Sequence, residues 1–224
     1  MGYVLQKANV VPVKSYIFDL DGTLLDSMGV WSNIDIEFLK KRGLAVPDDY
    51  FDKISAMGFS QVAAYTIERF GLPDTVEDLL REWSDMAAHA YGHRVQMKPH
   101  AKEYLLTLKE RGAMLAIATS AIPELCDLAL RSHGIYDWFN AICNSNEVGC
   151  GKSRPDVFLL TAQKLGVDPR DCIVFEDILD AVKSAKSVGM TVCGVYDKAS
   201  ESDWDAIRGM ADYAIVDFRD APVL

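Results

Sequence analysis

Apolar residues along the chain fall into two kinds of segment. Short apolar runs of the kind that form buried strands recur along most of the chain, at residues 16–18, 114–118, 141–143, 172–175, 191–195 and 213–216. From residue 99 onward, segments with helical spacing of their apolar positions alternate with these runs, at 101–111, 122–133, 155–165, 181–188 and around Ile207. Alternation of helices with uniformly apolar strands predicts an α/β fold, a parallel sheet with helices on both faces.

The segment between the first two predicted strands has a different character. From about residue 30 to 91, apolar residues recur at helical spacing and no strand pattern is evident. Helices are expected around 31–39, 62–70 and 76–86, and Thr75 is placed to cap the third. We therefore expect a separate all-helical domain, inserted into the α/β core just after its first strand.

Composition and charge limit the partners. The chain of 224 residues has room for a core domain with a smaller inserted one, and half of its residues are hydrophobic. Its formal net charge is −10 at pH 7 and its pI about 4.8, so its field repels a polyanion. We expect no nucleic-acid partner, whereas a few local cations and backbone amides can still hold a small anion.

Cysteine usage and apolar runs favour a cytoplasmic protein. The five cysteines are scattered without a C-x-x-C pair, which is typical of reduced thiols. Residues 1–12 lack the pattern of an export signal, and the longest apolar run, 113–118, is too short to span a bilayer. We expect no membrane partner, and a monomer, with a dimer as the alternative.

His89 and His93 are spaced i, i+4 without further ligands, which favours a solvated helix face over a metal site.

The residues that follow four of the predicted strands carry most of the candidate chemistry. In chain order they are Asp19 and Asp21, then Thr119 and Ser120, then a polar stretch reaching Lys152, then Glu176 and Asp177. Ligands of open parallel sheets bind outside the carboxyl ends of the strands. Each piece alone has an ordinary explanation, such as a surface loop, a helix start or a solvated lysine. Their shared position at strand ends indicates one site.

Such a set suits phosphoryl chemistry. Asp19 and Asp177, from two strand ends, form a hard oxygen site of the kind that Mg²⁺ occupies, and the metal reduces the repulsion between a carboxylate and an anionic phosphate. Lys152 adds a positive charge, and the hydroxyls after the second strand can donate to phosphate oxygens. Asp19 and Asp21 can divide the roles of nucleophile and general acid–base.

Four stretches at these strand ends match known motifs: residues 18–27 (FDLDGTLLDS), 117–120 (IATS), 151–158 (GKSRPDVF) and 174–177 (VFED). Together they resemble the haloacid dehalogenase superfamily, in its helical-cap group of β-phosphoglucomutase-like and phosphoglycolate phosphatase-like enzymes. The first motif is highly specific, and the resemblance extends from Lys14 to about Val216. It implies a Rossmann-like core over residues 1–28 and 96–224 and an inserted helical cap over 29–95.

The same resemblance implies roles for individual residues. Asp19 would be the nucleophile that becomes an aspartyl phosphate, and Asp21 the general acid and base. The implied Mg²⁺ ligands are Asp19, Asp21 through its carbonyl, Asp177, and Glu176 as a ligand or a neighbour of one. The implied phosphate contacts are Thr119, Lys152 and backbone amides near Leu20 and Ser120.

Two motifs depart from the family's pattern. Ser153 stands where a proline usually follows the lysine, and residues 178–181 read Ile-Leu-Asp-Ala in place of Ser-x-x-Gly. Neither change removes an implied ligand. Asp180 could add negative charge near the metal or cap the next helix, and of the two we expect the cap.

These features predict a Mg²⁺-dependent phosphatase for a small phosphorylated metabolite, such as a sugar or polyol phosphate. Asp21 favours this reaction over carbon–halogen cleavage, which needs no proton donated to a leaving alkoxide. Lys53, Met57 and Phe59, around a loop of the helical block, are candidate substrate contacts; packing of Met57 and Phe59 inside the cap is equally consistent with the sequence.

Other functions stay open at this point. A sugar phosphomutase is disfavoured because Ser55, Ala56 and Met57 precede the glycine of that loop, where β-phosphoglucomutases carry a basic residue. A non-catalytic regulator conflicts with the complete set of reactive positions. A partner-binding role for Trp138 and Trp204 is as consistent with the sequence as their packing in a core.

Overall fold

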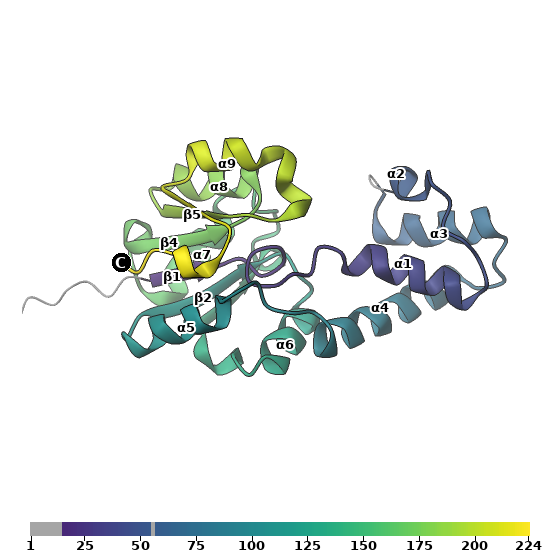
Figure 1. Cartoon of the computed structure of the whole chain (residues 1–224), viewed down its shortest axis with the longest axis horizontal. Coiled ribbons are helices and arrows are strands. Elements are labelled where there is room, and N and C mark those ends of the chain that lie inside the picture. The colour runs from purple at the N-terminus through teal and green to yellow at the C-terminus, as the bar shows by residue number, and fades with distance from the viewer. Residues whose placement is uncertain (1–14, 55–56) are drawn as a thin grey trace, which may run out of the picture. The chain divides into compact units, whose positions relative to one another are not determined.

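The computed structural model describes residues 15–54 and 57–224, which form two compact units (Figure 1). The first, the sheet unit, comprises residues 15–25 together with Met97–Ala121 and Ile135–Leu224. The second, the helical unit, comprises Asp26–Gln96 and Ile122–Gly134. The expectations about an export signal and about Ser55 and Ala56 lie outside the described residues. The domain boundaries at 28/29 and 95/96 stay a prediction.

The sheet unit is built on a six-stranded sheet in the order β3-β2-β1-β4-β5-β6, in which every neighbouring pair is parallel. This confirms the predicted α/β fold. The carboxyl ends of all these strands therefore meet at one edge of the sheet. The strands are β1 (Ser15–Phe18), β2 (Met114–Thr119), β3 (Ala141–Asn144), β4 (Cys172–Glu176), β5 (Thr191–Val195) and β6 (Tyr213–Ile215).

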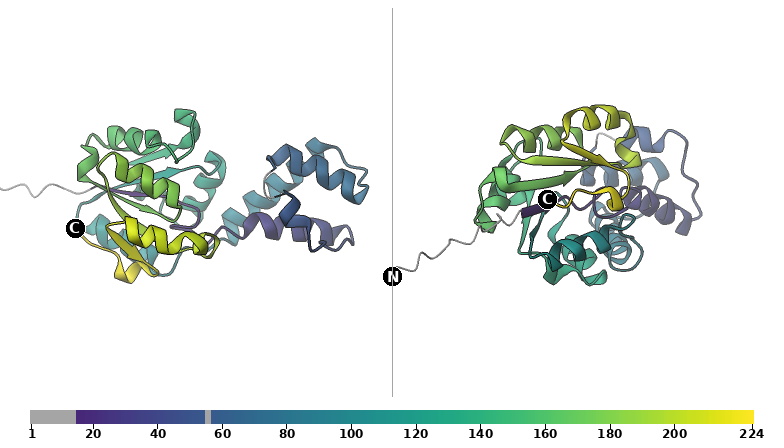
Figure 2. Two further views of the ribbon diagram at one scale, coloured as in Figure 1. Left: turned by 90° about the horizontal axis from the view of Figure 1, so that it is seen from above. Right: turned by 60° about the vertical axis from the view of Figure 1, so that its left-hand side comes forward.

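Helices cover both faces of the sheet (Figure 2). Ile17 of β1 points to one face, where a continuous apolar core includes Phe158 and Val182. Phe18 points to the other, where its ring stacks on Phe175 with centroids 4.7 Å apart. The helices of this unit are α5 (Ala101–Glu110), α7 (Asp156–Leu165), α8 (Leu179–Ser187) and α9 (Trp204–Met210).

The C-terminus closes the second face beside β1, as Figure 1 shows. The backbone N–H of Leu224 donates to Tyr16 Oη at 2.8 Å, and Tyr104 Oη donates to the carbonyl of Pro222 at 2.6 Å. Both tyrosines contribute to the aromatic cluster on that face, with ring centroids 6.5 Å apart. The last residues of the chain therefore belong to the packing that holds β1 in place.

The helical unit contains the helices that the apolar spacing predicts, with α1 and α3 both packed on α4. Phe38 of α1 meets Trp83 of α4 edge to face at 5.5 Å. A short helix around Tyr50 is not evident in the sequence pattern, because five residues show no periodicity. The helices are α1 (Val30–Lys41), α2 (Tyr50–Ile54), α3 (Phe59–Phe70), α4 (Val76–His93) and α6 (Pro123–Ser132).

The structure also bears on the expectations about membrane spans and about Trp138 and Trp204. Within the described residues, no helix is long and apolar enough to cross a membrane. Trp204 packs against the apolar core of the sheet unit and meets Tyr196 edge to face at 5.4 Å. Trp138 is half-buried, with the ammonium of Lys109 5.2 Å from its ring. Both tryptophans therefore have partners within the chain.

Thr75 caps α4 as predicted, and its replacement provides a test of the helical unit. Its hydroxyl accepts from the backbone N–H of Asp78 at 3.2 Å, and Asp78 Oδ2 accepts from the backbone N–H of Thr75 at 3.2 Å. We expect Thr75→Ala to lower the free energy of unfolding by about 1 kcal/mol, measured by urea denaturation. Thr75→Ser keeps the hydroxyl and should stay close to wild type; an equal loss in both variants would contradict the capping role.

Candidate active site

The turn after β1 presents Asp19 at the edge of the sheet. The backbone N–H of Asp19 donates to the carbonyl of Phe175 at 3.0 Å, which continues the pairing of β1 with β4. The carbonyl of Leu20 accepts from the N–H groups of Leu24 and Leu25 at 3.0 and 2.9 Å, so the chain turns sharply at this point. Asp19 is buried, and Asp21, within the turn, is half-buried.

Four of the predicted side chains meet at the carboxyl ends of β1 and β4. Carboxylate oxygens of Asp19, Glu176 and Asp177 lie within 4.8 Å of one another, and all three residues are buried. The buried ammonium of Lys152, from the loop after β3, forms ion pairs with Asp19 and with Glu176, at 2.9 Å to Glu176 Oε2. Three strand ends thus supply one compact charged site.

Burial and like charge dominate the electrostatics of this site. Burial raises the pKa of Asp19 to about 7, against the opposing effect of the Lys152 ammonium. Burial and the Asp19 carboxylate raise the pKa of Asp177 to about 7. Burial opposes the charge of Lys152, but Asp19 and Glu176 outweigh it and raise the pKa of the lysine. The site therefore holds its lysine charged and resists the ionisation of its acids.

The donor set fits a divalent cation with hard oxygen ligands. Three carboxylates share one ammonium, so full ionisation leaves two uncompensated negative charges in a buried space. A divalent cation would balance these charges. Oxygen ligands without sulfur or imidazole in the cluster suit Mg²⁺ or a similar ion.

Hydroxyl groups lie after β2, as the sequence predicts. Thr119 ends β2 and is buried, and its Oγ1 accepts from the backbone N–H of Ala121 at 3.0 Å, which leaves its hydroxyl proton available to a ligand. Ser120 Oγ and Ser145 Oγ lie 2.8 Å apart, and Ser145 Oγ donates to the carbonyl of Thr119 at 3.3 Å. Ser145 links the ends of β2 and β3, a role that the sequence pattern did not reveal.

Asp177 is held by two hydroxyls that sequence reasoning did not connect with it. Thr23 Oγ1 donates to Asp177 Oδ1 at 3.0 Å, and Ser200 Oγ donates to Asp177 Oδ2 at 3.3 Å. Ser200 follows β5, as does the buried Asp197, which forms an ion pair with Lys98 at 2.5 Å. Asp197 lies just after the fifth predicted strand, so its position at a strand end is visible in the sequence.

The expected cap at Asp180 is wrong. The residue that precedes α8 is Ile178, and no side chain caps the helix there. Asp180 lies in the first turn, exposed, and pairs with Lys183 at 2.9 Å. The N–H of Ile178 is instead satisfied by Glu176 Oε1 at 3.2 Å, because the buried glutamate reaches forward along the chain.

The three candidate substrate contacts lie in the helical unit and separate into two groups. Met57 and Phe59 line a cavity of about 190 Å³. Lys53 is exposed on α2 and is not among the residues that line this cavity. The structure therefore brings two of the three together.

The family model of haloacid dehalogenase-like hydrolases matches residues 16–195. The match contains every predicted site residue from Asp19 to Asp177. It also spans the whole of the segment 26–96 that belongs to the helical unit.

Known proteins resemble the chain over most of its length. It is 30% identical to a Drosophila melanogaster protein described as a probable pseudouridine-5'-phosphatase, over 81% of this chain and 80% of that protein. It is 23% identical to hexitol phosphatase B of Escherichia coli, over 78% of this chain and 79% of that protein. The crystal structure of β-phosphoglucomutase from Clostridium difficile has the same fold, with a TM-score of 0.66 and 17% identity over 94% of this chain and 93% of that one.

Gly22 allows a direct test of the site's geometry. Its φ is +87°, and an added Cβ would lie 2.4 Å from Asp177 Oδ2. We expect Gly22→Ala to lower the free energy of unfolding by about 1–2 kcal/mol and the affinity for Mn²⁺, measured by electron paramagnetic resonance, by about tenfold or more.

Gly112→Ala is the matched control. Gly112 has a similar φ of +76° with no atom within 4 Å of an added Cβ. This variant should lose similar stability and bind Mn²⁺ as the wild type does. Equal Mn²⁺ affinities in the two variants would contradict the proposed contact between Gly22 and the acidic cluster.

Proposed function

Because the chain belongs to the haloacid dehalogenase-like hydrolase family, we propose that it releases phosphate from a small phosphorylated metabolite through a covalent intermediate on Asp19. The chain is a phosphoric monoester hydrolase. The observation that carries the proposal is the meeting of Asp19, Glu176, Asp177 and Lys152 at strand ends of one parallel sheet.

The first half of the reaction transfers the phosphoryl group to the protein. A carboxylate oxygen of Asp19 attacks phosphorus, and the bond from phosphorus to the leaving oxygen of the ester breaks. Asp21, two residues along the same turn, gives a proton to that leaving oxygen. The alcohol departs, and Asp19 carries the phosphoryl group as a mixed anhydride.

The second half returns the protein to its starting state. Asp21, now a carboxylate, takes a proton from a water molecule whose oxygen attacks phosphorus. The bond between phosphorus and the Asp19 oxygen breaks, inorganic phosphate leaves, and Asp21 is protonated for the next cycle. Proton donation and recovery by one residue require that Asp21 stay accessible, and it is only half-buried.

The same residues would hold the phosphate. Lys152 supplies a fixed positive charge beside Asp19, and the hydroxyl of Thr119 can donate to a phosphate oxygen. Backbone amides near Leu20 and Ser120 complete the expected set of donors. Charge-assisted donors already fixed in place stabilise the charge that develops in the transition state without reorganisation.

We propose Mg²⁺ as the cofactor, held by Asp19, Asp177, the carbonyl of Asp21, and Glu176 directly or through water. When bound, it offsets the negative charge shared by the carboxylates and the phosphate. Thr23 and Ser200 fix both oxygens of Asp177, so this ligand is oriented before the ion arrives.

Release to water, not return to a sugar, is the proposed fate of the phosphoryl group. The described residues nearest the loop glycine, Met57 and Phe59, carry no charge that could grip a second phosphate. Substrates in the size range of sugar and polyol phosphates fit the names of the relatives. A bisphosphosugar requirement for product formation would indicate a mutase, whereas steady phosphate release without one supports the phosphatase.

Replacement of the nucleophile should abolish the reaction. We expect Asp19→Asn to lower phosphate release from p-nitrophenyl phosphate in Mg²⁺ on the order of 10³-fold or more, because an amide cannot attack phosphorus. Asp180→Asn is the matched control, since this exposed acid follows Asp177 of the acidic cluster by three residues but pairs with Lys183. Unchanged release in the Asp19 variant would exclude the nucleophile assignment.

Removal of the metal should also abolish the reaction. We expect EDTA to reduce phosphate release to background and added Mg²⁺ to restore it. Ca²⁺ should restore little, because it prefers more ligands at longer distances than this compact set provides. Full activity in excess EDTA would contradict the role of the acidic cluster.

A further inference from the structure

The cavity in the helical unit combines aromatic walls with one buried acid. It is lined by residues of α1, α2, α3 and α4 and by Met57 between α2 and α3: Trp31, Ile34, Asp35, Ile54, Met57, Phe59, Val62 and Trp83. Its volume of about 190 Å³ has room for about six water-sized groups. Trp31, Met57 and Phe59 are exposed by 37%, 36% and 40%, so the cavity is open to solvent on that side.

The acid in this cavity lacks a good hydrogen-bond donor. Asp35 is only 8% exposed, and among the described residues the one side chain that donates to it is Tyr50, whose Oη lies 3.5 Å from Asp35 Oδ1. Tyr50 Oη lies much closer, at 2.8 Å, to Thr66 Oγ1, and Thr66 Oγ1 donates to the carbonyl of Val62 at 2.8 Å. Each hydroxyl has one proton. The two short bonds use both protons, which leaves the Asp35 carboxylate only the long contact with Tyr50.

A second polar group of the cavity wall is also unsatisfied. Trp83 is 1% exposed, and its Nε1 donor has no acceptor among the described residues. A buried donor without an acceptor is rare and costs free energy. This atom is fully buried, so a molecule in the cavity cannot reach it, and the poorly paired polar group that the cavity presents is Asp35.

The aromatic rings make the wall favourable for a cation. Trp31 and Phe59 meet edge to face at 5.2 Å, and the ring of Phe59 lies 5.7 Å from that of Trp83. Ring faces attract organic cations, most strongly where water is excluded. A carboxylate beside such rings adds a full opposite charge in a site of reduced dielectric.

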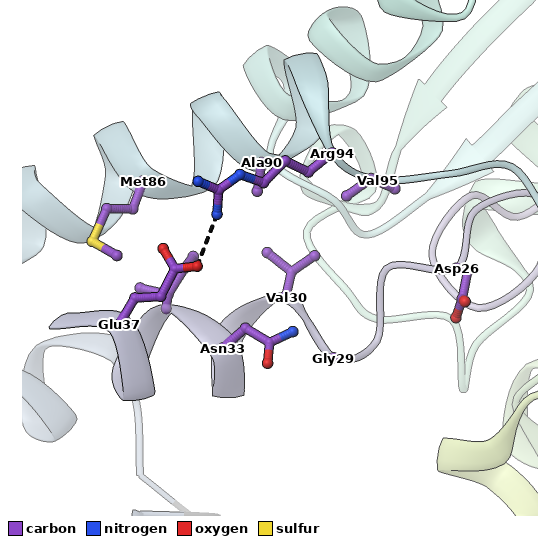
Figure 3. A pocket seen from close by; sticks show the side chains of 10 residues that line it. Asp26, Gly29, Val30, Asn33, Glu37, Met86, Ala90, Arg94 and Val95 are labelled. Atoms are coloured by element: carbon purple, nitrogen blue, oxygen red, sulfur yellow. Dashed lines mark hydrogen bonds and ion pairs between the residues drawn. The ribbon is translucent and has the colours of Figure 1, made fainter. Parts of the chain in front are cut away.

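A neighbouring cavity also contains a carboxylate, but there the carboxylate is paired with a cation. It has a volume of about 290 Å³ and lies between α1 and α4, and Figure 3 shows the charged groups in its wall. Glu37 Oε1 there accepts from Arg94 Nη1 at 2.8 Å, so the acid and the base neutralise each other. Nothing comparable neutralises Asp35 within the described residues.

We propose that the cavity around Asp35 binds a small organic ammonium, as in an amino alcohol. The ammonium would lie against Asp35 and the rings of Trp31 and Phe59. A metal ion fits less well, because a single carboxylate and an aromatic wall offer too few oxygen ligands.

Choline and 3,3-dimethylbutan-1-ol are the probes, since they share shape and hydroxyl and differ in charge. We expect choline to bind the wild-type protein in Mg²⁺ at least about tenfold more tightly than the neutral alcohol, followed by fluorescence of Trp31 and Trp83 and by calorimetry. Asp35→Asn should weaken choline binding about tenfold or more and leave the alcohol unaffected. Glu37→Gln, on the same helix and outside this cavity, should change neither.

Three results would overturn the proposal. Equal affinities for choline and the neutral alcohol would show an apolar pocket only. Unchanged choline binding in Asp35→Asn would exclude the carboxylate. Absence of choline binding up to about 50 mM would exclude an ammonium site of useful strength.

The Asp35→Asn variant is expected to fold. Burial raises the pKa of Asp35 to about 6, so above that pH the folded state carries an ionised acid in an unfavourable place. Asp35 should therefore lower the stability of the wild type as the pH rises from about 4 to 6, and the fall should be smaller in the asparagine variant, where only other buried acids such as Asp19 and Asp177 contribute to it. At pH 7 the variant should unfold at a urea concentration no lower than the wild type does.

Choline binding does not depend on the proposed function. An inactive protein that binds choline would contradict the phosphatase proposal alone, and an active protein that does not bind choline would contradict the cavity proposal alone.

Discussion

The structure of the sheet unit depends on the burial of three carboxylates around one ammonium. Asp19, Glu176 and Lys152 are drawn together because each would be unstable alone in the interior. A parallel sheet makes this arrangement possible, since the ends of β1, β3 and β4 open on the same edge. The remaining negative charge is what makes the site receptive to a divalent cation and then to phosphate.

Much of this site could be predicted from the sequence because strand ends and motifs are local features. The run Tyr16-Ile17-Phe18 predicts where β1 ends, and so where Asp19 lies. The same reasoning cannot show which side chains hold Asp177. Thr23 and Ser200 reach it from positions far apart in the chain, and only the packing of the turn against the loop after β5 brings them together. Long-range contacts of this kind leave no periodic signal.

In the helical unit, periodicity predicted helices but not their polar interior. Trp31, Asp35 and Phe38 follow one another at i, i+4 and i+7, so the spacing places an acid on the apolar side of α1. That signal was present in the sequence. What it could not give is the competition of Asp35 and Thr66 for the single proton of Tyr50, which depends on distances across α2 and α3.

The buried acidic sites around Asp19 and around Asp35 differ in how their charge is compensated, and this difference predicts different ligands. At Asp19 an ammonium lies within ion-pair distance and further carboxylates surround it, so an added cation must be small and tolerate many oxygens. At Asp35 the neighbours are rings, and no side chain among the described residues brings a positive charge to it. A polyvalent metal would lack ligands there, whereas an organic ammonium gains from the carboxylate and from the ring faces. The oxygen ligands around Asp19 therefore suit a small metal ion and phosphate chemistry. The aromatic wall around Asp35 suits an organic amine instead.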